Sequence, residues 1–478
     1  MASSKKRFPK IRYVGARSAA LTILLQIHRQ EPFADSVIDS MLETSNVSNL
    51  DRPLITELVY GVLRHRETLD WRLNHVADRP VERLPLTLAM IFRLGAYQLL
   101  HLDRIPPSAA VNESVKLAKT VKGRDWSGMM NAVLRNLMRQ SAPAWPHIDE
   151  DPVRAFSIRY SCPPWMVERW VHAWGIDRTR TLCESTLHIP PLTLRTNTLC
   201  CTRGELLRLL QRQGYEARAT LLSPLGITIK KCGDLKDLSP LQEGYCYIED
   251  EAAQLIPTLL DAKPEHHVLD VCAAPGGKTT HISQHMQNQG NILALDSNAQ
   301  RLHLVRKNAE RLGLTNITTH CGDITKETSG RVSTSSQGEQ DPSQASPFAQ
   351  TFDRILVDAP CSGLGTLRRH PEGKWWKGPQ LIQQARSAQE KILDRASALL
   401  RPGGVLVYSA CSIEKEETHD VVKSFLAEHQ EFSQDTVEPW LPAAARSLID
   451  ETGCLLTAFN DASMDGFFAA RFVKGHRT

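Results

Sequence analysis

The sequence predicts a multidomain protein with an all-α region, a small α+β module, and an α/β domain with a mostly parallel, doubly wound sheet. The length of 478 residues exceeds what one hydrophobic core usually serves. Residues 16–140 show apolar side chains at three- and four-residue spacing, with no strand-like alternation. From about residue 248, short apolar strand patterns alternate with helical ones. We therefore expect domains at 1–145, 146–247 and 248–478.

Amphipathic spacing predicts five helices in the first region, at 16–28, 53–66, 86–101, 109–119 and 128–139. Pro53 suits the first turn of a helix behind Asp51, and Ser108 is the expected N-cap after Pro106-Pro107. A linker-like stretch follows at 141–152. The next residues mix both patterns, with expected helices at 165–174 and 203–213 and expected strands at 192–197 and 226–230.

Five short apolar runs predict the strands of the third domain, at 268–271, 292–296, 317–320, 355–358 and 405–408, with helical patterns at 298–312 and 381–400. Repeated strand–helix units indicate a doubly wound parallel sheet. Residues 327–351 break this rhythm, because they are polar and carry almost no large apolar side chains. Such a segment cannot bury enough surface to offset its ordering entropy, so we expect a disordered surface insertion.

Charge and cysteine content exclude several classes of protein. The net charge of +4 does not indicate a nucleic-acid binder, although residues 1–12 hold several basic side chains and no acidic one. Such a run is a solvated tail or a phosphate contact. Eleven cysteines occur without a C-x-x-C pair, so we expect neither a metal nor a disulfide scaffold. No apolar stretch reaches the roughly 18 residues of a membrane span, so we expect a cytoplasmic protein without membrane association.

The stretch Asp270-Val-Cys-Ala-Ala-Pro-Gly-Gly-Lys-Thr-Thr280 has two interpretations. It ends like a nucleotide-binding P-loop, but Cys272 stands where that loop has its first glycine, and a positive φ there carries a steric cost. A nucleoside-binding turn instead predicts a carboxylate about 20 residues on, at the end of the next strand. Asp296 ends that strand. We therefore expect Asp296 to bind ribose hydroxyls, with a helix N-cap as the alternative role.

Two cysteines follow strand ends at the edge where a doubly wound sheet binds its ligands. A thiolate is the natural nucleophile for adding to an electron-poor ring carbon. Addition at pyrimidine C6 lets C5 attack a methyl sulfonium, after which the C5 proton and the thiolate must leave. That scheme needs a nucleophilic cysteine, a carboxylate and a base, which Cys411, Asp358 and Cys361 can supply. Small buried structural cysteines are the alternative.

Three motifs lie at these strand ends: Ala273-Ala-Pro-Gly-Gly-Lys278, Asp358-Ala-Pro-Cys361-Ser-Gly and Tyr408-Ser-Ala-Cys411-Ser. Arg368-Arg-His-Pro-Glu372, Trp375 and Asp465-Gly-Phe-Phe468 accompany them. Together they resemble the motifs of the RNA cytosine-C5 methyltransferases of the Sun (Fmu) family, in particular its RsmB branch. Residues 16–140, with Leu94-Gly-Ala-Tyr-Gln98 and Asn131-Ala-Val-Leu-Arg-Asn136, resemble a NusB-like RNA-binding domain.

The resemblance implies methylation of cytosine C5 in 16S rRNA by a Rossmann-like domain, with S-adenosylmethionine as methyl donor and RNA as partner. It implies that Cys411 is the nucleophile and that Cys361 helps to resolve the covalent intermediate. It also places Asp358 on the side of the site that faces the cofactor and the target base. It also implies that Asp296 binds the ribose and Asp323 the adenine edge. The turn lining the S-adenosylmethionine site would comprise Cys272, Ala273, Ala274, Pro275, Gly276, Gly277 and Lys278. We expect a monomer.

Two other functions stay open on the residues alone. One is an RNA-binding protein in the manner of an antitermination factor, with an inert Rossmann-like domain; the pair Cys361 and Cys411 speaks against it. The other is a P-loop NTPase, which Cys272 disfavours. The sequence departs from the family at Ala410, where threonine is frequent. Because of the insertion at 327–351, the resemblance does not define the geometry of the loop around Asp323.

Overall fold

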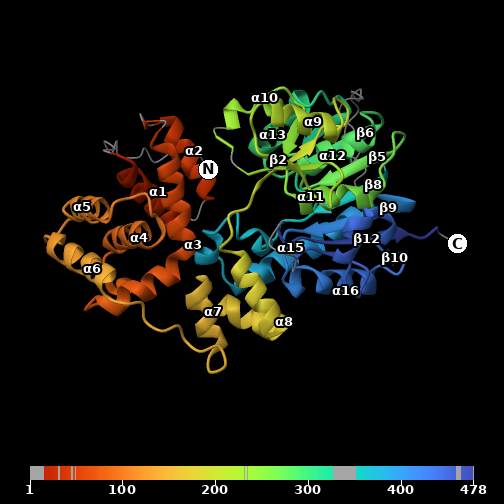
Figure 1. Ribbon diagram of the computed structural model, residues 1–478. Helices are drawn as coiled ribbons and strands as arrows, with labels where there is room; N and C mark the ends of the chain where they lie inside the picture. The colour runs from red at the N-terminus through yellow and green to blue at the C-terminus, as the bar shows by residue number, and fades with distance from the viewer. Residues whose placement is uncertain are drawn as a thin grey trace, which may run out of the picture. The chain divides into compact units, whose positions relative to one another are not determined.

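The computed structural model describes residues 15–30, 33–44, 47–48, 50–230, 232–233, 235–326, 351–458 and 464–476 (Figure 1). The basic run within residues 1–12 lies outside the described residues, and so does the expected insertion at 327–351 except for residue 351. By compactness the chain forms two units. The first comprises residues 1–188 and 367–377, and the second comprises residues 189–366 and 378–478.

The first unit is helical wherever its described residues form regular structure. It contains α1 (Ala16–Gln30), α2 (Ala34–Thr44), α3 (Arg52–Val76), η1 (Val81–Arg83), α4 (Leu86–His101), α5 (Pro107–Ala118), α6 (Ser127–Arg139), α7 (Pro152–Tyr160), α8 (Pro164–Ser185) and α14 (Gly373–Trp376). The five helices expected within 16–139 are confirmed. Periodicity missed α2, whose sequence is rich in Ser, Asp and Thr.

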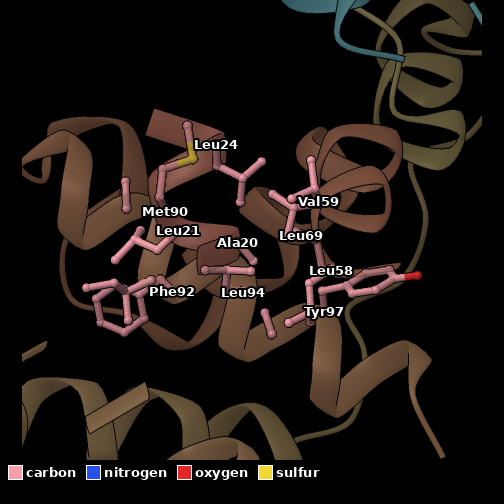
Figure 2. Packing of buried hydrophobic residues seen from close by; sticks show 14 of the residues in the cluster. Ala20, Leu21, Leu24, Leu58, Val59, Leu69, Met90, Phe92, Leu94 and Tyr97 are labelled. Carbon is pink, nitrogen blue, oxygen red and sulfur yellow. The ribbon is translucent and has the colours of Figure 1, made fainter. Parts of the chain in front are cut away.

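Apolar faces of α1, α3 and α4 build the core of this unit. Figure 2 shows Leu24 of α1, Leu58 of α3 and Leu94 of α4 within one packed cluster. Burying one such side chain contributes about 1.5–3 kcal/mol relative to leaving it exposed. Beside the core, Arg93 of α4 donates two hydrogen bonds of 2.7 Å to the buried Asp70 carboxylate on α3. The two charges are therefore paired where water is excluded.

Two local expectations about helix starts have different outcomes. Asp51 is the N-cap of α3, which carries a proline in its first turn, as expected. The expectation that Ser108 caps α5 is wrong, because that helix begins at Pro107 behind Pro106. The N–H groups of the first helical turn have no partner within the helix, so a proline, which has no N–H, is well suited to that position. Pro107 therefore starts α5 before Ser108 can act as a cap.

The chain divides after residue 188, whereas the composition placed a boundary near 145. Residues 141–151 form no regular helix or strand, but α7 and α8 beyond them belong to the first unit. Thr68 of α3 donates a 2.6 Å hydrogen bond to the carbonyl of Ile158, and the Glu67 N–H donates one of 2.9 Å to Ser161. These contacts tie α7 to α3. The three domains expected at 1–145, 146–247 and 248–478 stay a prediction, because a division of the chain by compactness does not test which parts fold independently.

A segment from the second half of the sequence completes the first unit. Lys374 is 1% exposed, and its ammonium donates to the carbonyls of Arg64 at 3.2 Å and Ser161 at 2.9 Å. The indole N–H of Trp375 donates to the Leu63 carbonyl at 2.7 Å. Residues 367–377, which carry the arginine-rich motif, therefore fold as part of the helical unit.

The second unit begins with a small antiparallel sheet in the order β2-β3-β1-β4. Its strands are β1 (Leu192–Thr196), β2 (Ala217–Ala219), β3 (Gly226–Ile229) and β4 (Cys246–Ile248), and α9 (Arg203–Arg212) joins β1 to β2. Thr202 and Glu205 form a capping box at the start of α9. The expected strands at 192–197 and 226–230 and the expected helix between them are confirmed, whereas β2 and β4 are too short for a periodic signal.

The larger sheet has the order β10-β12-β9-β8-β5-β6-β7, with β11 paired to β12. Its strands are β5 (His267–Val271), β6 (Asn291–Asp296), β7 (Ile317–Cys321), β8 (Phe352–Asp358), β9 (Leu400–Ala410), β10 (Phe432–Asp435), β11 (Leu455–Leu456) and β12 (Phe468–Lys474). Strands β5 to β9 pair in parallel, and β12 pairs antiparallel to β9, β10 and β11. The predicted mostly parallel sheet is confirmed.

Helices cover both faces of this sheet. On one face α15 (Pro379–Ala398) and α16 (His419–Glu428) pack through residues such as Leu393 and Phe425, and on the other α12 (Gly277–His285) packs through Ile282. Next to α12 lies α13 (Ala299–Arg311) (Figure 1). The strand order reverses between β5 and β8, and such a switch point opens a crevice at the carboxyl ends of the strands.

A buried ion pair ties the small sheet to the start of α12. Arg195 of β1 is 0% exposed and donates 2.7 Å hydrogen bonds to the Glu249 carboxylate and the Gly277 carbonyl, and one of 2.8 Å to Thr280. Its guanidinium also lies 5.2 Å from the ring centre of Tyr247. The small sheet therefore supports the turn that precedes α12.

We expect Arg195→Met to destabilise the protein by about 3–5 kcal/mol, because it leaves the Glu249 carboxylate buried without its partner. Calorimetric unfolding of the full chain measures the change. Arg218→Met, at an exposed position of β2, is the matched control and should shift stability by less than about 0.5 kcal/mol. Equal unfolding temperatures for the two variants would contradict the supporting role of Arg195.

Candidate active site

The glycine-rich turn lies between β5 and α12 and has an unusual backbone. Cys272 adopts φ of 64° and Gly276, the N-cap of α12, φ of 101°. A Cβ on Gly276 would stand 3.1 Å from the Cα of Val305, so glycine is needed there for space as well as for φ. Cys272 thus has the positive φ whose steric cost counted against a P-loop at this position. The structure accepts a cost of about 1–3 kcal/mol at this position.

Lys278 reaches across the switch point and is paired with a carboxylate. Its ammonium lies 2.7 Å from Asp358 Oδ2 and 4.9 Å from the ring centre of Phe467. Burial opposes the charge, but the attraction and hydrogen bond of Asp358 outweigh it, so the pKa of Lys278 lies above its ordinary value. The other Asp358 oxygen accepts a 2.8 Å hydrogen bond from Ser409. Because Lys278 is committed to Asp358, the turn does not offer the free lysine of a P-loop.

A cavity of about 360 Å³ lies beside the turn and is lined by Cys272, Asp296, Gly322 and Asp323, and by residues of α15 such as Lys391. Asp296 accepts the N–H groups of Ala274 at 3.2 Å and Asn298 at 2.9 Å.

The N-cap of α13 is Asn298, whose side chain accepts the N–H groups of Gln300 and Arg301. The capping alternative for Asp296 is therefore excluded. Asp296 is instead one of the residues that line the cavity.

Asp323 lines the same cavity from the end of β7. Its carboxylate accepts the Thr325 hydroxyl at 2.7 Å and lies 2.9 Å from the Lys326 ammonium. The hydrogen bond from Lys326 is the main cause of a pKa below the ordinary value for this carboxyl. The structure thus brings Cys272, Asp296 and Asp323 to one cavity, as the sequence predicted for the strand ends.

A smaller cavity of about 160 Å³ adjoins the other side of the turn. Its lining includes Ala273, Ala274, Pro275, Gly277 and Lys278 together with Tyr247, Glu249, Asp270 and Asp358. Asp270 is fully buried, and one of its oxygens accepts the Thr279 hydroxyl at 2.6 Å. Among the described residues its other oxygen, Oδ1, has no hydrogen-bond partner. Burial raises the pKa of Asp270 to about 7.

The two strand-end cysteines lie side by side. The Sγ atoms of Cys361 and Cys411 are 3.1 Å apart, because β8 and β9 are parallel neighbours with Asp358 opposite Ser409. The hydrogen bond to Cys411 and burial raise the pKa of Cys361 well above its ordinary value, so Cys361 keeps its proton. Lys278 and Cys411 attract each other electrostatically. Cys361 is therefore the protonated partner of the pair, and Cys411 lies within electrostatic range of a cation.

Close backbone packing fixes the loop around these sulfurs. The Gly365 N–H donates to the Cys411 carbonyl at 3.1 Å, and the Gly466 N–H donates to the Gly365 carbonyl at 2.8 Å. A Cβ on Gly365 would collide with the Gly466 carbonyl. Two glycines therefore allow the motif that begins at Asp465 to pack closely against the loop that carries Cys361.

Sequence reasoning did not assign Asp270, Ser409 or Phe467 to the site. An acid in the middle of an apolar strand was the one available signal, and it marks Asp270. Nothing local marks Ser409 or Phe467, whose partners Asp358 and Lys278 are distant in sequence.

The described residues contain no group of three or more His, Cys, Asp and Glu side chains that could hold a metal ion. In the same parts of the chain, no helix is both long and apolar enough to cross a membrane.

Comparisons with known proteins match most of the chain. A family model described as 16S rRNA methyltransferase RsmB/F matches residues 257–473, the NusB family matches 15–139, and a ferredoxin-like domain of RsmF/B-like methyltransferases matches 162–236. The chain is 34% identical over 462 residues to the probable ribosomal RNA small subunit methyltransferase B of Synechocystis sp., covering 96% of this chain and 100% of that protein. It is 34% identical over 459 residues to the Bacillus subtilis protein of the same name, covering 96% and 98%. The crystal structure of PH0851 has the same fold, with a TM-score of 0.76 at 23% identity over 98% of this chain and 100% of that one.

Asp270 should make stability fall as pH rises. Its pKa of about 7 in the folded protein exceeds the ordinary value near 4, so between about pH 4 and 7 the folded state holds more protons than the unfolded state. The ionised form is disfavoured by folding, and the loss reaches at most about 1.4 kcal/mol per pH unit. Asp270→Asn removes this titration, so its unfolding temperature should fall less than that of the wild type between pH 5 and 7. Asp237→Asn, at an exposed position, is the control; identical pH profiles for all three proteins would count against a buried titrating Asp270.

Proposed function

The chain belongs to the family of ribosomal RNA small subunit methyltransferase B and is an rRNA methyltransferase, and on this premise we propose how it methylates cytosine C5 in 16S rRNA. We propose S-adenosylmethionine as the methyl donor and Cys411 as a covalent nucleophile. One observation carries the mechanism, namely the 3.1 Å separation of Cys361 and Cys411 beside the Lys278–Asp358 pair.

The two cavities suit S-adenosylmethionine by the chemistry of their polar groups. Asp296 presents a carboxylate to the larger cavity, where it can accept ribose hydroxyls, and Asp323 stands near it for the adenine edge. The unpaired Asp270 oxygen in the smaller cavity can accept from the α-ammonium of the methionine part. When bound, S-adenosylmethionine supplies an electrophilic methyl group. The turn from Cys272 to Lys278 lies between the two cavities and would hold it.

Cys411 begins the reaction as a thiolate next to the Lys278 ammonium. Its sulfur forms a bond to C6 of the cytosine, and the electron pair of the C5=C6 double bond moves toward C5. Asp358 is fixed by Lys278 and Ser409 at the same sheet edge. There it can accept a hydrogen bond from the amino edge of the base and so hold the ring for attack.

Cys361 acts after the methyl group has reached C5. The C5 proton must then pass to a base, for which the Asp358 carboxylate at the same sheet edge is available, and the electron pair of the C5–H bond restores the double bond while the C6–S bond breaks. The Cys361 thiol keeps its proton and donates toward the Cys411 sulfur, so it can stabilise that sulfur as it departs as a thiolate. Cys361 thereby assists resolution of the intermediate.

The helical unit would contact the RNA. Its exposed basic residues after α5 include Lys119, Lys122 and Arg124, which suit phosphate contacts. The relatives named above act on ribosomal RNA of the small subunit, as their names state. The alternative that this unit binds RNA while the α/β domain is inert is opposed by the cysteine pair. The NTPase alternative is opposed by the ion pair of Lys278 with Asp358.

Asp296 should contribute to binding of the methyl donor. Asp296→Asn keeps the shape of the side chain but replaces charge-assisted hydrogen bonds to the ribose by neutral ones, which are about half as strong. We expect the Kd for S-adenosylmethionine to rise about tenfold, that is by about 1.4 kcal/mol, in titration calorimetry. Asp394→Asn on α15 is half exposed outside the cavity and should bind like the wild type. An unchanged Kd for Asp296→Asn would remove this residue from the site.

The two cysteines should fail in opposite ways. Cys411→Ser removes the nucleophile, because a hydroxyl is far less ionised than a thiol at neutral pH, so neither an adduct nor methyl transfer is expected. Cys361→Ser should still add to the base and accept the methyl group but then stall, leaving protein joined to RNA. Denaturing gels with 16S rRNA and S-adenosylmethionine should show a shifted band for Cys361→Ser alone.

Two further variants make the assay decisive. The double variant Cys361→Ser/Cys411→Ser should lose the band, and Cys200→Ser, at an exposed position remote in sequence, should retain full activity. A band from Cys411→Ser instead would reverse the two roles. Full activity in both single variants would refute the thiolate mechanism.

A further inference from the structure

One buried carboxylate links the two cysteine loops. Glu417 lies in η7 (Lys415–Glu417) and is 0% exposed. Its Oε1 accepts the Ser362 N–H at 2.6 Å, and its Oε2 accepts the Ser412 hydroxyl at 2.5 Å and also the Ser362 hydroxyl. The two serine oxygens lie 3.4 Å apart, so both hydroxyls converge on one carboxylate oxygen.

These serines directly follow the two reactive residues in sequence, Ser362 after Cys361 and Ser412 after Cys411. A carboxylate that binds both serines therefore fixes the spacing of the two loops just beyond their sulfur atoms. The Gly365 N–H bond to the Cys411 carbonyl also joins the two loops near the sulfurs.

The position of Glu417 is itself held from two sides. The Tyr408 hydroxyl donates a 2.6 Å hydrogen bond to its backbone carbonyl. The Gln389 amide lies 3.4 Å from Oε1 and donates at 3.0 Å to the carbonyl of Pro360, the residue before Cys361. Glu417, Tyr408 and Gln389 are all buried. Burying a carboxylate is costly unless several donors compensate it, so an arrangement with this many donors restricts Glu417 to one position.

We infer that Glu417 is a positioning residue that holds Cys361 and Cys411 at the sulfur separation which the covalent reaction needs. Glu417 does not reach the sulfurs in any contact described above, and it acts through the two serines. The inference deepens the proposed function and rests on it, because only a reaction that uses both sulfurs in sequence requires their spacing to be fixed.

The test compares Glu417→Gln, Glu417→Ala and the matched control Glu416→Gln from the same turn. Glutamine keeps the size of the side chain and one acceptor oxygen, but its NH2 group cannot accept, so either the Ser362 N–H or the two serine hydroxyls lose their acceptor. For each protein we would measure the unfolding temperature, the Kd for S-adenosylmethionine, kcat and KM with 16S rRNA, and the rate of iodoacetamide modification of each cysteine against pH, read by mass spectrometry.

We expect Glu417→Gln to bind S-adenosylmethionine within twofold of the wild type and to lower kcat tenfold or more, with KM for RNA little changed. Its cysteine modification should shift in rate and pH profile at both Cys361 and Cys411. Glu417→Ala should lose more activity than Glu417→Gln, and Glu416→Gln should match the wild type throughout. Wild-type kcat and modification profiles in Glu417→Gln would overturn the inference. So would a loss of kcat that follows only the loss of folded protein.

Adduct formation separates this inference from the proposed function. In the Cys361→Ser background, Glu417→Gln should slow the appearance of the protein–RNA band tenfold or more. If Cys361→Ser alone gives no band, the covalent mechanism has failed, whatever Glu417 does. If that band forms and Glu417→Gln leaves its rate unchanged, the covalent mechanism stands and the positioning role of Glu417 is wrong.

Discussion

The ion pair of Lys278 and Asp358 is the interaction on which the rest of the site depends. It joins the start of α12, beyond the first strand of the parallel sheet, to the end of β8, across the point where the strand order reverses. A lysine in a glycine-rich turn of this kind can serve a phosphate only if its charge is free. Here the charge of Lys278 is paired with Asp358, and the turn that resembles a nucleotide-binding motif separates two cavities lined by aspartates.

The same pair organises the chemistry at the sheet edge. Asp358 accepts a hydrogen bond from Ser409 on β9, two residues before Cys411, and the charge of Lys278 lies within electrostatic range of Cys411. A single cation thus positions the carboxylate and favours negative charge on one of two adjacent thiols. The raised pKa of Cys361 complements this, because two neighbouring sulfurs cannot both be anionic at low cost.

Much of the fold followed from the sequence because its elements are periodic. Most of the parallel strands contain short apolar runs, and α4 begins and ends where its pattern does, at Leu86 and His101. β12 was missed since Phe468-Ala-Ala-Arg-Phe-Val-Lys474 neither alternates nor stays apolar: Arg471 is buried in it and pairs with Asp435. The membership of residues 367–377 in the helical unit has no local signature, because it depends on acceptors near Leu63 and Ser161.

The candidate site divides in the same way between local and distant causes. That Cys361 and Cys411 would meet was predictable, because parallel strands end at one edge. The partner of Lys278, the unpaired oxygen of Asp270 and the contacts of Glu417 were not, because each depends on side-chain directions set by packing. Cys272 differs from these residues, because its positive φ is a conformation that the surrounding fold imposes against the steric preference of an isolated residue.

The interrupted helical unit has a consequence for synthesis on the ribosome. Residues 367–377 are translated long after α1 to α8, yet Lys374 and Trp375 supply the donors for carbonyls of α3 and of the turn after α7. At the usual rate of about 5–20 residues per second, roughly ten seconds or more separate the emergence of Ser161 from that of Lys374. During that interval these carbonyls lack the donors that Lys374 and Trp375 later supply. The strands β5 to β8 of the larger sheet are therefore made before the helical unit can be completed.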